Sequence, residues 1–175
     1  MEYREIPGTG KTASRIVFGL GGGAFWSGDG VEALLDAAAA EGINFFDTAR
    51  VYGQSEHSLG QWMEKRGLRD QMVVLSKCCH PDLSSWTSRV NAEEMQRDLA
   101  QSLEALQTDY IDIYLLHRDD PRTEVGELVE TFNAMHVEGR SEHSAAPTGR
   151  MNASRRQMSM VDHDFTVNPE FLVEP

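Results

Sequence analysis

The chain has 175 residues, enough for one domain with its own core, in which folding buries roughly 70% of the surface of the unfolded chain. Its formal net charge of -12 argues against a nucleic-acid partner and against an anionic membrane surface, although local backbone donors can still hold a phosphate-bearing cofactor. The two cysteines, Cys78 and Cys79, are adjacent and do not suit a structural disulfide, and no apolar run approaches the ~20 residues of a membrane span, so a cytoplasmic setting is expected.

The first predicted element is a hairpin. Residues 3–6, a Pro-Gly turn and the residues from Ala13 onward predict two short strands that lead into a first buried strand at residues 16–18. A glycine cluster follows, and the next helix is expected to begin near Val31 with Asp29 as its N-cap. Gly42 has the position just past this helix, where glycine is common.

Strands and helices alternate through the next hundred or so residues. Apolar runs predict strands at residues 43–46, 72–77 and 111–116. Helices are predicted at residues 56–65, then after Asn91, which begins a capping box with Glu94, and at residues 123–137. This alternation indicates successive βαβ units and a parallel sheet, hence an α/β fold.

Four polar side chains follow the carboxyl ends of predicted strands. They are Asp47, Tyr52, Lys77 and His117. Each alone has an ordinary explanation, as a loop residue, a surface aromatic, a strand-end charge or a core histidine. The carboxyl ends of parallel strands, however, are where α/β barrels keep their chemistry. The joint occurrence therefore indicates a catalytic site.

These four groups suit the reduction of a carbonyl. A tyrosine has a reference pKa of about 10, so donating a proton near neutrality calls for a neighbouring cation that favours phenolate. Lys77 can be that cation, Asp47 its anionic partner, and His117 can orient or polarise the carbonyl oxygen. Hydride would come from a cofactor.

A Rossmann-type dinucleotide-binding domain is the alternative. Gly19, Gly21 and Ala24 satisfy G-x-G-x-x-A after a strand, and Asp47 ends the next strand, as that fingerprint requires. Against it, the predicted helix does not open on the glycines but begins near Val31. The glycines are better explained as a tight loop under a ligand.

Two other motifs are rejected. Gly10-Lys11-Thr12 looks like the end of a phosphate loop, but Glu5 stands where that motif needs its first glycine. The run Cys78-Cys79-His80 offers three consecutive ligands with no clear fourth, so no metal site is expected.

Three segments together resemble the aldo-keto reductase family. They are Phe-Asp-Thr-Ala-Arg-Val-Tyr-Gly at residues 46–53, Leu-Ser-Lys at residues 75–77, and the strand with its following loop at residues 110–121; the resemblance covers residues 1–140. It implies a (β/α)8 TIM barrel that uses NADP(H) or NAD(H) to reduce an aldehyde or ketone. It also implies a catalytic tetrad of Asp47, Tyr52, Lys77 and His117, with Tyr52 as general acid. Cofactor binding is assigned to Gly22, Gly23 and Asp47.

The chain departs from this family after Arg140. A barrel typically needs about 250 residues, and only the four N-terminal βα units, preceded by the hairpin, can be counted, so a partial barrel is expected. Residues 141–160 have no apolar periodicity, and the strand expected after Arg140 is missing; residues 141–175 are interpreted as a divergent tail. One hypothesis is a single-base deletion after the Arg140 codon, because a shifted frame can spell a strand followed by Gly-Gly-Ser-Asn. An unstructured tail is the alternative, and the coding DNA decides between them.

These departures lower the expected activity. Barrel enzymes frequently bind the phosphate of the ligand with the loops after strands seven and eight, so this truncated chain is expected to have little or no turnover. The expected partner is a small-molecule carbonyl substrate. A half-barrel exposes a strand edge and an apolar face, so self-association is also expected, and a non-catalytic role in subunit interaction is a second alternative.

Overall fold

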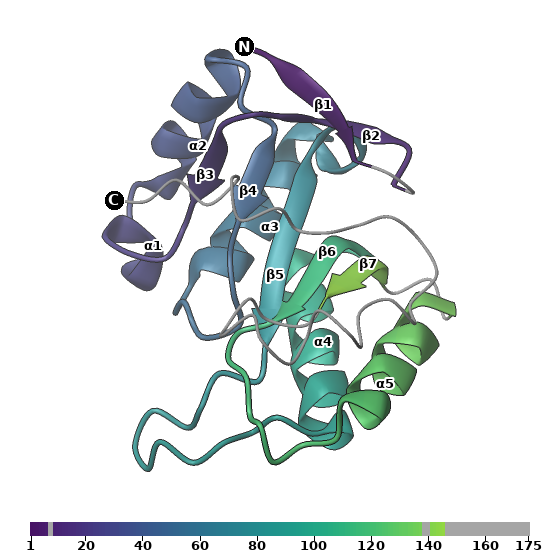
Figure 1. Ribbon diagram of the computed structural model, residues 1–175. Helices are drawn as coiled ribbons and strands as arrows, with labels where there is room; N and C mark the ends of the chain where they lie inside the picture. The colour runs from purple at the N-terminus through teal and green to yellow at the C-terminus, as the bar shows by residue number, and fades with distance from the viewer. Residues whose placement is uncertain (7–8, 138–140, 146–175) are drawn as a thin grey trace.

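The computed structural model describes residues 1–6, 9–137 and the backbone of residues 141–145, which form a hairpin and a parallel sheet flanked by helices (Figure 1). The hairpin strands are β1 (Tyr3–Ile6) and β2 (Lys11–Ser14), and the sheet strands are β3 (Val17–Gly19), β4 (Phe45–Asp47), β5 (Val73–Cys78), β6 (Ile111–Leu116) and β7 (Ser141–Ala145). The helices are α1 (Ala24–Ser27), α2 (Val31–Ala40), α3 (Ser55–Arg66), α4 (Ala92–Leu106) and α5 (Val125–Val137), with a 3-10 turn, η1 (Arg69–Gln71).

The sheet strands lie in the order in which they occur along the chain. The order is β3-β4-β5-β6-β7, and every neighbouring pair is parallel. Crossovers between parallel strands are right-handed, so successive crossovers that advance in one direction place their helices on the same face of the sheet. Accordingly, α2 to α5 lie around the outside of the strands (Figure 1). A doubly wound Rossmann sheet reverses its strand order at a switch point, which the described sheet does not do. The fold is therefore a partial (β/α)8 barrel, and the Rossmann alternative is wrong.

The outer core lies between the strands and the helices. Phe46 of β4, Val74 of β5 and Tyr114 of β6 are fully buried there. The ring of Phe46 packs edge-on against that of Trp62 on α3, with centroids 5.5 Å apart. This apolar layer holds α3 against the sheet.

The inner core lies on the opposite face of the strands, under the hairpin. Val73 and Leu75 of β5 and Ile113 of β6 pack there against Ile6 and Ala13 of the hairpin. Side chains alternate between the two faces of a strand, so the next inward positions along β5 and past the end of β6 are residues 77 and 117. The alternation of side chains that fills the barrel interior thus also places Lys77 and His117 on the inner face, at the carboxyl ends of β5 and β6.

A buried carboxylate ties the hairpin to the sheet. Asp112 of β6 is completely buried and pairs with Lys11 at 2.7 Å and with Arg69 at 2.9 Å. It also accepts a hydrogen bond from the backbone N–H of Val74 at 2.9 Å. These contacts join the hairpin, η1, β5 and β6 at the end of the sheet away from the predicted catalytic residues.

The helix caps agree only in part with the sequence-based prediction. The Asn91 cap is confirmed, since its side chain accepts a hydrogen bond from the backbone N–H of Glu94 at 3.0 Å. The Asp29 cap is wrong: Gly30 caps α2 in a left-handed conformation, φ 69, without a side-chain bond. A four-residue helix, α1, also opens directly after Gly23, which the apolar pattern did not predict.

A strand follows Arg140, contrary to prediction. Residues of β7 pair in parallel with β6, with Ser141 opposite Ile111 and His143 opposite Ile113. Backbone hydrogen bonds make this pairing, and they do not require the apolar side chains on which the prediction relied. Residues 146–175 lie outside the described residues, so the divergent tail and the single-base deletion stay predictions. Within the described part of the chain, no helix is both long and apolar enough to cross a membrane, and the cytoplasmic setting stays a prediction.

Candidate active site

Lys77 and Asp47 form an ion pair at the carboxyl ends of β5 and β4. The ammonium of Lys77 donates a hydrogen bond to Oδ1 of Asp47 and a second one, at 2.9 Å, to the backbone carbonyl of Thr48. The Asp47 side chain keeps 29% of its surface exposed. The pair therefore combines a held ammonium with a carboxylate that a ligand can still reach.

Tyr52 lies in the loop between β4 and α3, and its ring lies beside the Lys77 ammonium of this pair. The centre of its ring is 5.2 Å from Nζ of Lys77. A Cβ atom added to Gly21, in the loop after β3, would lie 3.3 Å from two atoms of this ring. The glycine thus allows the β3 loop to approach the phenol closely, and the ring is held between two loops.

His117 completes the group from the end of β6. Its backbone N–H bonds the carbonyl of Cys78 at 2.8 Å, which keeps the residue in register with β5. Its ring meets that of Tyr52 edge-on, with centroids 5.5 Å apart, and its Nδ1 atom is buried with no hydrogen-bond partner among the described residues. The structure therefore brings all four predicted residues together at one end of the sheet.

The electrostatics of Tyr52 differ from the sequence-based expectation. Burial raises the pKa of Tyr52, and the charge of Asp47 raises it further, against a smaller lowering by Arg118. Burial also lowers the pKa of Lys77, although Asp47 opposes this shift. Lys77 directs its hydrogen bonds at Asp47 and Thr48 and lies over the ring of Tyr52, so it does not favour the phenolate as expected. Tyr52 consequently remains a protonated phenol at neutral pH.

His117 is neutral under the same conditions. Burial lowers its pKa to about 4, and the charges of Lys77, His80 and Arg118 lower it in the same direction. A neutral imidazole can still donate one N–H to an oxygen atom without adding a positive charge beside Lys77. This property fits hydrogen bonding to a carbonyl.

Glu56 lies behind the site and was missed by the sequence analysis. This α3 carboxylate is 1% exposed, accepts a hydrogen bond from Oγ of Ser76 at 2.6 Å and pairs with Arg50 at 3.3 Å. Burial raises the pKa of Glu56, and hydrogen bonds and Arg50 oppose this. Its position in the first turn of a helix made it look like an ordinary exposed acidic residue. Only the packing of α3 on β5 shows that it is buried next to the strand that carries Lys77.

The glycine loop predicted to bind cofactor runs along the same edge of the sheet. It follows β3, whose Gly19 is the register partner of Asp47. A Cβ atom at Gly22 or at Gly23 would meet no heavy atom of the described residues within 4 Å. The backbone here has open space beside it, which suits the close approach of a ligand.

Two cavities in the described part of the chain lie beside this cluster rather than within it. One, of about 340 Å³, lies next to α3 and α4 and includes His57; the other, of about 310 Å³, is bordered by Val51 and His80, which adjoin the cluster. Arg50 and Gln101 line both cavities. The convergence of the four side chains, rather than the size of a cavity, identifies the candidate site.

Comparisons with known proteins agree with this geometry. The sequence profile described as "Aldo/keto reductase family" matches residues 15–161. The chain is 35% identical to aldo-keto reductase YhdN of Bacillus subtilis (strain 168), covering 80% of this chain and 45% of that protein, and 36% identical to aryl-alcohol dehydrogenase GME11368 of Pestalotiopsis microspora, covering 61% and 30%. The crystal structure of PA4992 from Pseudomonas aeruginosa, a candidate aldo-keto reductase, superimposes with a TM-score of 0.70 at 29% identity, covering 82% of this chain and 59% of that one.

The match is partial in length. The chain spans about half the length of these relatives. It covers 45% of YhdN and 59% of PA4992. The family profile nevertheless covers well over half of this chain and runs past Arg140. The chain therefore belongs to the aldo/keto reductase family of oxidoreductases.

Proposed function

We propose that the cluster of Asp47, Tyr52, Lys77 and His117 is the proton-transfer part of a carbonyl reductase that takes hydride from NADP(H) or NAD(H). The observation that carries the proposal is the position of the Tyr52 ring, which contacts both Lys77 and His117 while Lys77 holds Asp47. The oxidoreductase relatives support the general reaction. The substrate is a small aldehyde or ketone, and the product is the alcohol.

The proton comes from the phenol of Tyr52. As hydride adds to the carbonyl carbon, negative charge develops on the carbonyl oxygen, and the Tyr52 O–H bond breaks to form the O–H bond of the alcohol. A phenol whose pKa is raised can still protonate this oxygen, because an alkoxide is a much stronger base than a phenolate. The ammonium of Lys77 lies over the face of the Tyr52 ring, 5.2 Å from its centre. Asp47 keeps that ammonium in place.

His117 binds the oxygen that receives the proton. Its pKa, lowered to about 4, keeps the imidazole neutral, so it acts as an N–H donor. The neutral ring also avoids repulsion with Lys77. Hydrogen bonding from a fixed ring orients the carbonyl before proton transfer.

The nicotinamide cofactor, when bound, supplies the hydride. The residues of the described chain that would hold it are Gly22, Gly23 and Asp47. The open space beside the two glycines and the partly exposed Asp47 carboxylate fit a ligand that approaches backbone closely and has hydroxyl groups to donate. The choice between NADP(H) and NAD(H) depends on contacts with the far end of the cofactor.

We expect the chain by itself to turn over slowly or not at all. Barrel enzymes frequently bind the ligand phosphate with loops after strands seven and eight, whereas the described sheet has five strands. The test is purified chain with NADPH and an aromatic aldehyde, compared with Tyr52→Phe. Any turnover of the unmodified chain should disappear in the variant, because phenylalanine has no proton to donate. Equal turnover in both would contradict the role of Tyr52.

If the chain shows no turnover, binding of the product alcohol tests the roles of Tyr52 and His117 instead. Binding of an alcohol, the product, should weaken in Tyr52→Phe and in His117→Phe, since both hydrogen-bonding groups face the same oxygen. Unchanged affinity in both variants would also contradict the proposal.

A role in subunit interaction is the second candidate. In the described sheet, β3 and β7 each pair with a single neighbouring strand, so each presents an edge whose backbone groups can pair with another chain. Sedimentation at several protein concentrations would test this. A stable oligomer without turnover favours the interaction role, and a monomer at all concentrations excludes it.

A further inference from the structure

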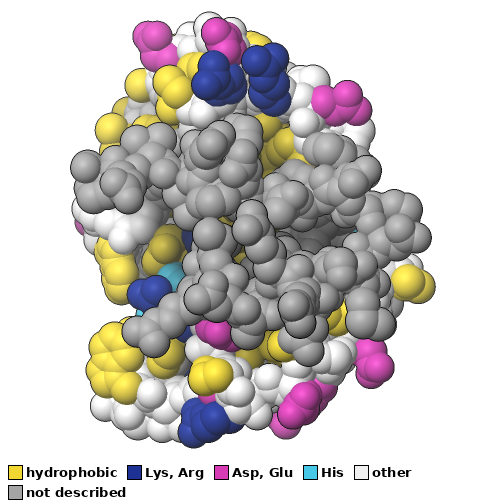
Figure 2. Space-filling view, viewed as in Figure 1, with side chains coloured by type: hydrophobic (Ala, Val, Ile, Leu, Met, Phe, Trp, Pro, Cys, Tyr) yellow, Lys and Arg dark blue, Asp and Glu magenta, His cyan; other side chains and the backbone are white. Residues whose placement is uncertain are grey.

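The loop between β4 and α3 carries Tyr52, so the position of this loop decides where the proposed proton donor lies. The ring of Tyr52 is only half-buried, and its contacts with His117 and Lys77 are made by the ring, whereas the hydroxyl bonds none of the described residues. Figure 2 shows a histidine side chain beside Lys or Arg side chains at the left of the molecule, with apolar side chains above and below them. The backbone of the loop must therefore hold the ring in place.

The hydrogen bonds within this loop shape it without attaching it to the sheet. The backbone N–H of Tyr52 bonds the carbonyl of Ala49 at 3.0 Å, and the N–H of Ser55 bonds the carbonyl of Tyr52 at 3.1 Å. Each bond joins residues that are three positions apart. Contacts over a longer range are needed to fix the loop against β5.

Two side chains, one on each side of Tyr52, supply those contacts. Nη1 of Arg50 lies 3.3 Å from Oε2 of Glu56, in the first turn of α3, so the ion pair closes the segment of residues 50–56 around Tyr52. Both ends of the segment are also attached to β5. The backbone N–H of Arg50 bonds the carbonyl of Lys77 at 3.2 Å, and Oε1 of Glu56 accepts a hydrogen bond from Oγ of Ser76 at 2.6 Å.

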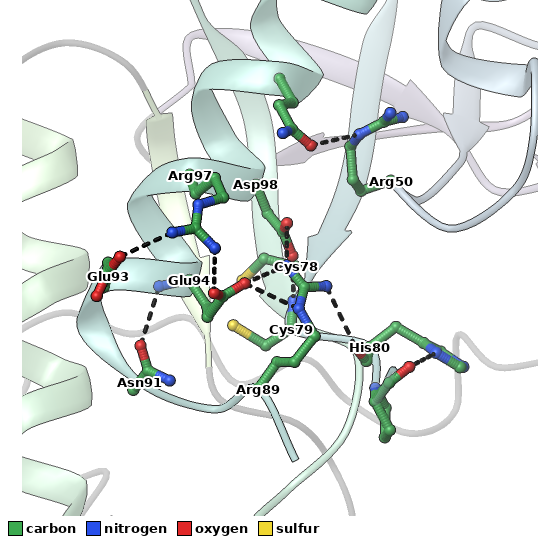
Figure 3. A network of polar contacts seen from close by, with 12 residues as sticks. Arg50, Cys78, Cys79, His80, Arg89, Asn91, Glu93, Glu94, Arg97 and Asp98 are labelled. Carbon is green, nitrogen blue, oxygen red and sulfur yellow. Dashed lines mark hydrogen bonds and ion pairs between the residues drawn. The ribbon is translucent and has the colours of Figure 1, made fainter. Parts of the chain in front are cut away.

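Each member of the pair depends on the other. Glu56 is 1% exposed, and in the part of the chain that the structure describes Arg50 is the cation that pairs with it. Burial raises the pKa of Glu56, and Arg50 opposes this shift. Nε of Arg50 also donates to Gln101 on α4 at 3.1 Å, while Asp98, which borders one of the same cavities, pairs with Arg89 instead (Figure 3). The Arg50 guanidinium is thus directed at Glu56 and α4.

We propose that the Arg50–Glu56 pair positions Tyr52, by closing the loop that carries the phenol and holding that loop on β5 beside Lys77. Arg50 and Glu56 are positioning residues, because they act through the backbone of residues 50–56 and not on the reacting atoms. Hydrogen bonds between charged groups favour a defined geometry, so the pair selects one arrangement of the loop. The inference rests on the proposed function, in which proton transfer depends on where the Tyr52 ring lies.

NMR of the tyrosine rings in the whole chain tests the proposal without cofactor or turnover. The chain has four tyrosines, and the fully buried Tyr114 on β6 reports on the core. Arg50→Gln should shift the ring signals of Tyr52 and leave those of Tyr114 in place. It should also lower the pKa of Tyr52 towards 10, because burial is the main cause of its raised value. Lys65→Gln, which removes the cation of an exposed pair with Glu32 from the same helix α3, is the matched control and should change neither.

Two further variants separate the ion pair from the rest of the contacts. Arg50→Lys keeps the positive charge and should restore part of the Tyr52 signal position. Glu56→Gln keeps an acceptor for Ser76 but loses the charge, so it should shift the Tyr52 signals as Arg50→Gln does. The double variant should add little to either single change, because each removes the same contact. If Glu56→Gln does not fold, Arg50→Gln decides, since the Arg50 side chain is 35% exposed.

Several results would overturn the proposal. They are unchanged Tyr52 signals in Arg50→Gln, an equal shift in Lys65→Gln, a shift of Tyr114 together with Tyr52, and independent effects that add up in the double variant. Failure of the proposed function is distinguishable from these results. Turnover that survives Tyr52→Phe contradicts that function, whereas the ring signals report the position of Tyr52 whether or not the chain turns over.

Discussion

The ammonium of Lys77 lies over the ring of Tyr52, 5.2 Å from its centre, and directs its hydrogen bonds at Asp47 and at the carbonyl of Thr48. A cation over a ring face is attracted by the electrons of the ring, but it does not bond the hydroxyl. This arrangement explains why burial and Asp47 determine the pKa of Tyr52 and raise it. The site therefore keeps the phenol of Tyr52 protonated.

Replacing Asp47 tests this electrostatic arrangement. Asp47→Asn removes a charge that raises the pKa of Tyr52 and also the main charge that supports the protonated form of Lys77. We expect the pKa values of both Tyr52 and Lys77 to fall. NMR titration of the phenol carbon and of the lysine ε-carbon measures them. Asp119→Asn, an exposed acidic residue in the loop after His117, is the control; a rise in either pKa in Asp47→Asn would contradict the arrangement.

The stability of the chain should fall in a pH window set by His117. Its pKa is lowered from 6.5 to about 4, so between these values the unfolded state binds a proton that the folded state does not. Stability is therefore lost as pH falls from 6.5 towards 4, by about 3 kcal/mol at most and less because the ring is only half-buried. Urea denaturation across this window should show a shallower loss for His117→Gln than for the unmodified chain. His57→Gln, at an exposed histidine on α3, should leave the loss unchanged.

In the loop after β3, substitution of Gly21 should disturb the position of the Tyr52 ring, whereas substitution of Gly22 should not. A Cβ atom at Gly21 would lie 3.3 Å from the Tyr52 ring, whereas one at Gly22 would meet no described atom within 4 Å. Gly21→Val should therefore displace the ring and shift the NMR signals of Tyr52 and His117, with a loss of roughly tenfold or more in any turnover. Gly22→Val should leave the ring signals in place. Equal effects of the two substitutions would show that the loop does not position Tyr52.

The carboxylate under the hairpin should be important for stability. Asp112 is buried between Lys11 and Arg69, so Asp112→Ala leaves two cations without their partner and should cost about 3–5 kcal/mol. The free energy of unfolding from urea denaturation measures it. The surface pair of Arg15 with Glu2, whose side chains are 55% and 67% exposed, is the comparison, and Glu2→Ala should produce no measurable change. Similar results for the two variants would mean that Asp112 does not anchor the hairpin.

Much of the architecture could be predicted from short stretches of sequence. The strand at residues 111–116 and the Asn91 cap were predicted with their observed bounds, because an apolar run and a capping box are encoded within a few neighbouring residues. The convergence of Asp47, Lys77 and His117 was also predictable, since parallel strands carry their carboxyl ends to one edge.

Other features were decided only by tertiary contacts. The strand β7 depends on backbone pairing with β6, and the burial of Glu56 depends on how α3 packs on β5. The contact between His80 and His117 joins residues that are distant in the chain. The raised pKa of Tyr52 requires knowing both how deeply its ring is buried and where the charge of Lys77 is directed. The sequence by itself thus determined which groups reach the rim of the sheet, because periodicity and strand direction are local properties. The three-dimensional packing decided the charge states of these groups and the rings that they contact, because burial and distance depend on residues from several strands at once.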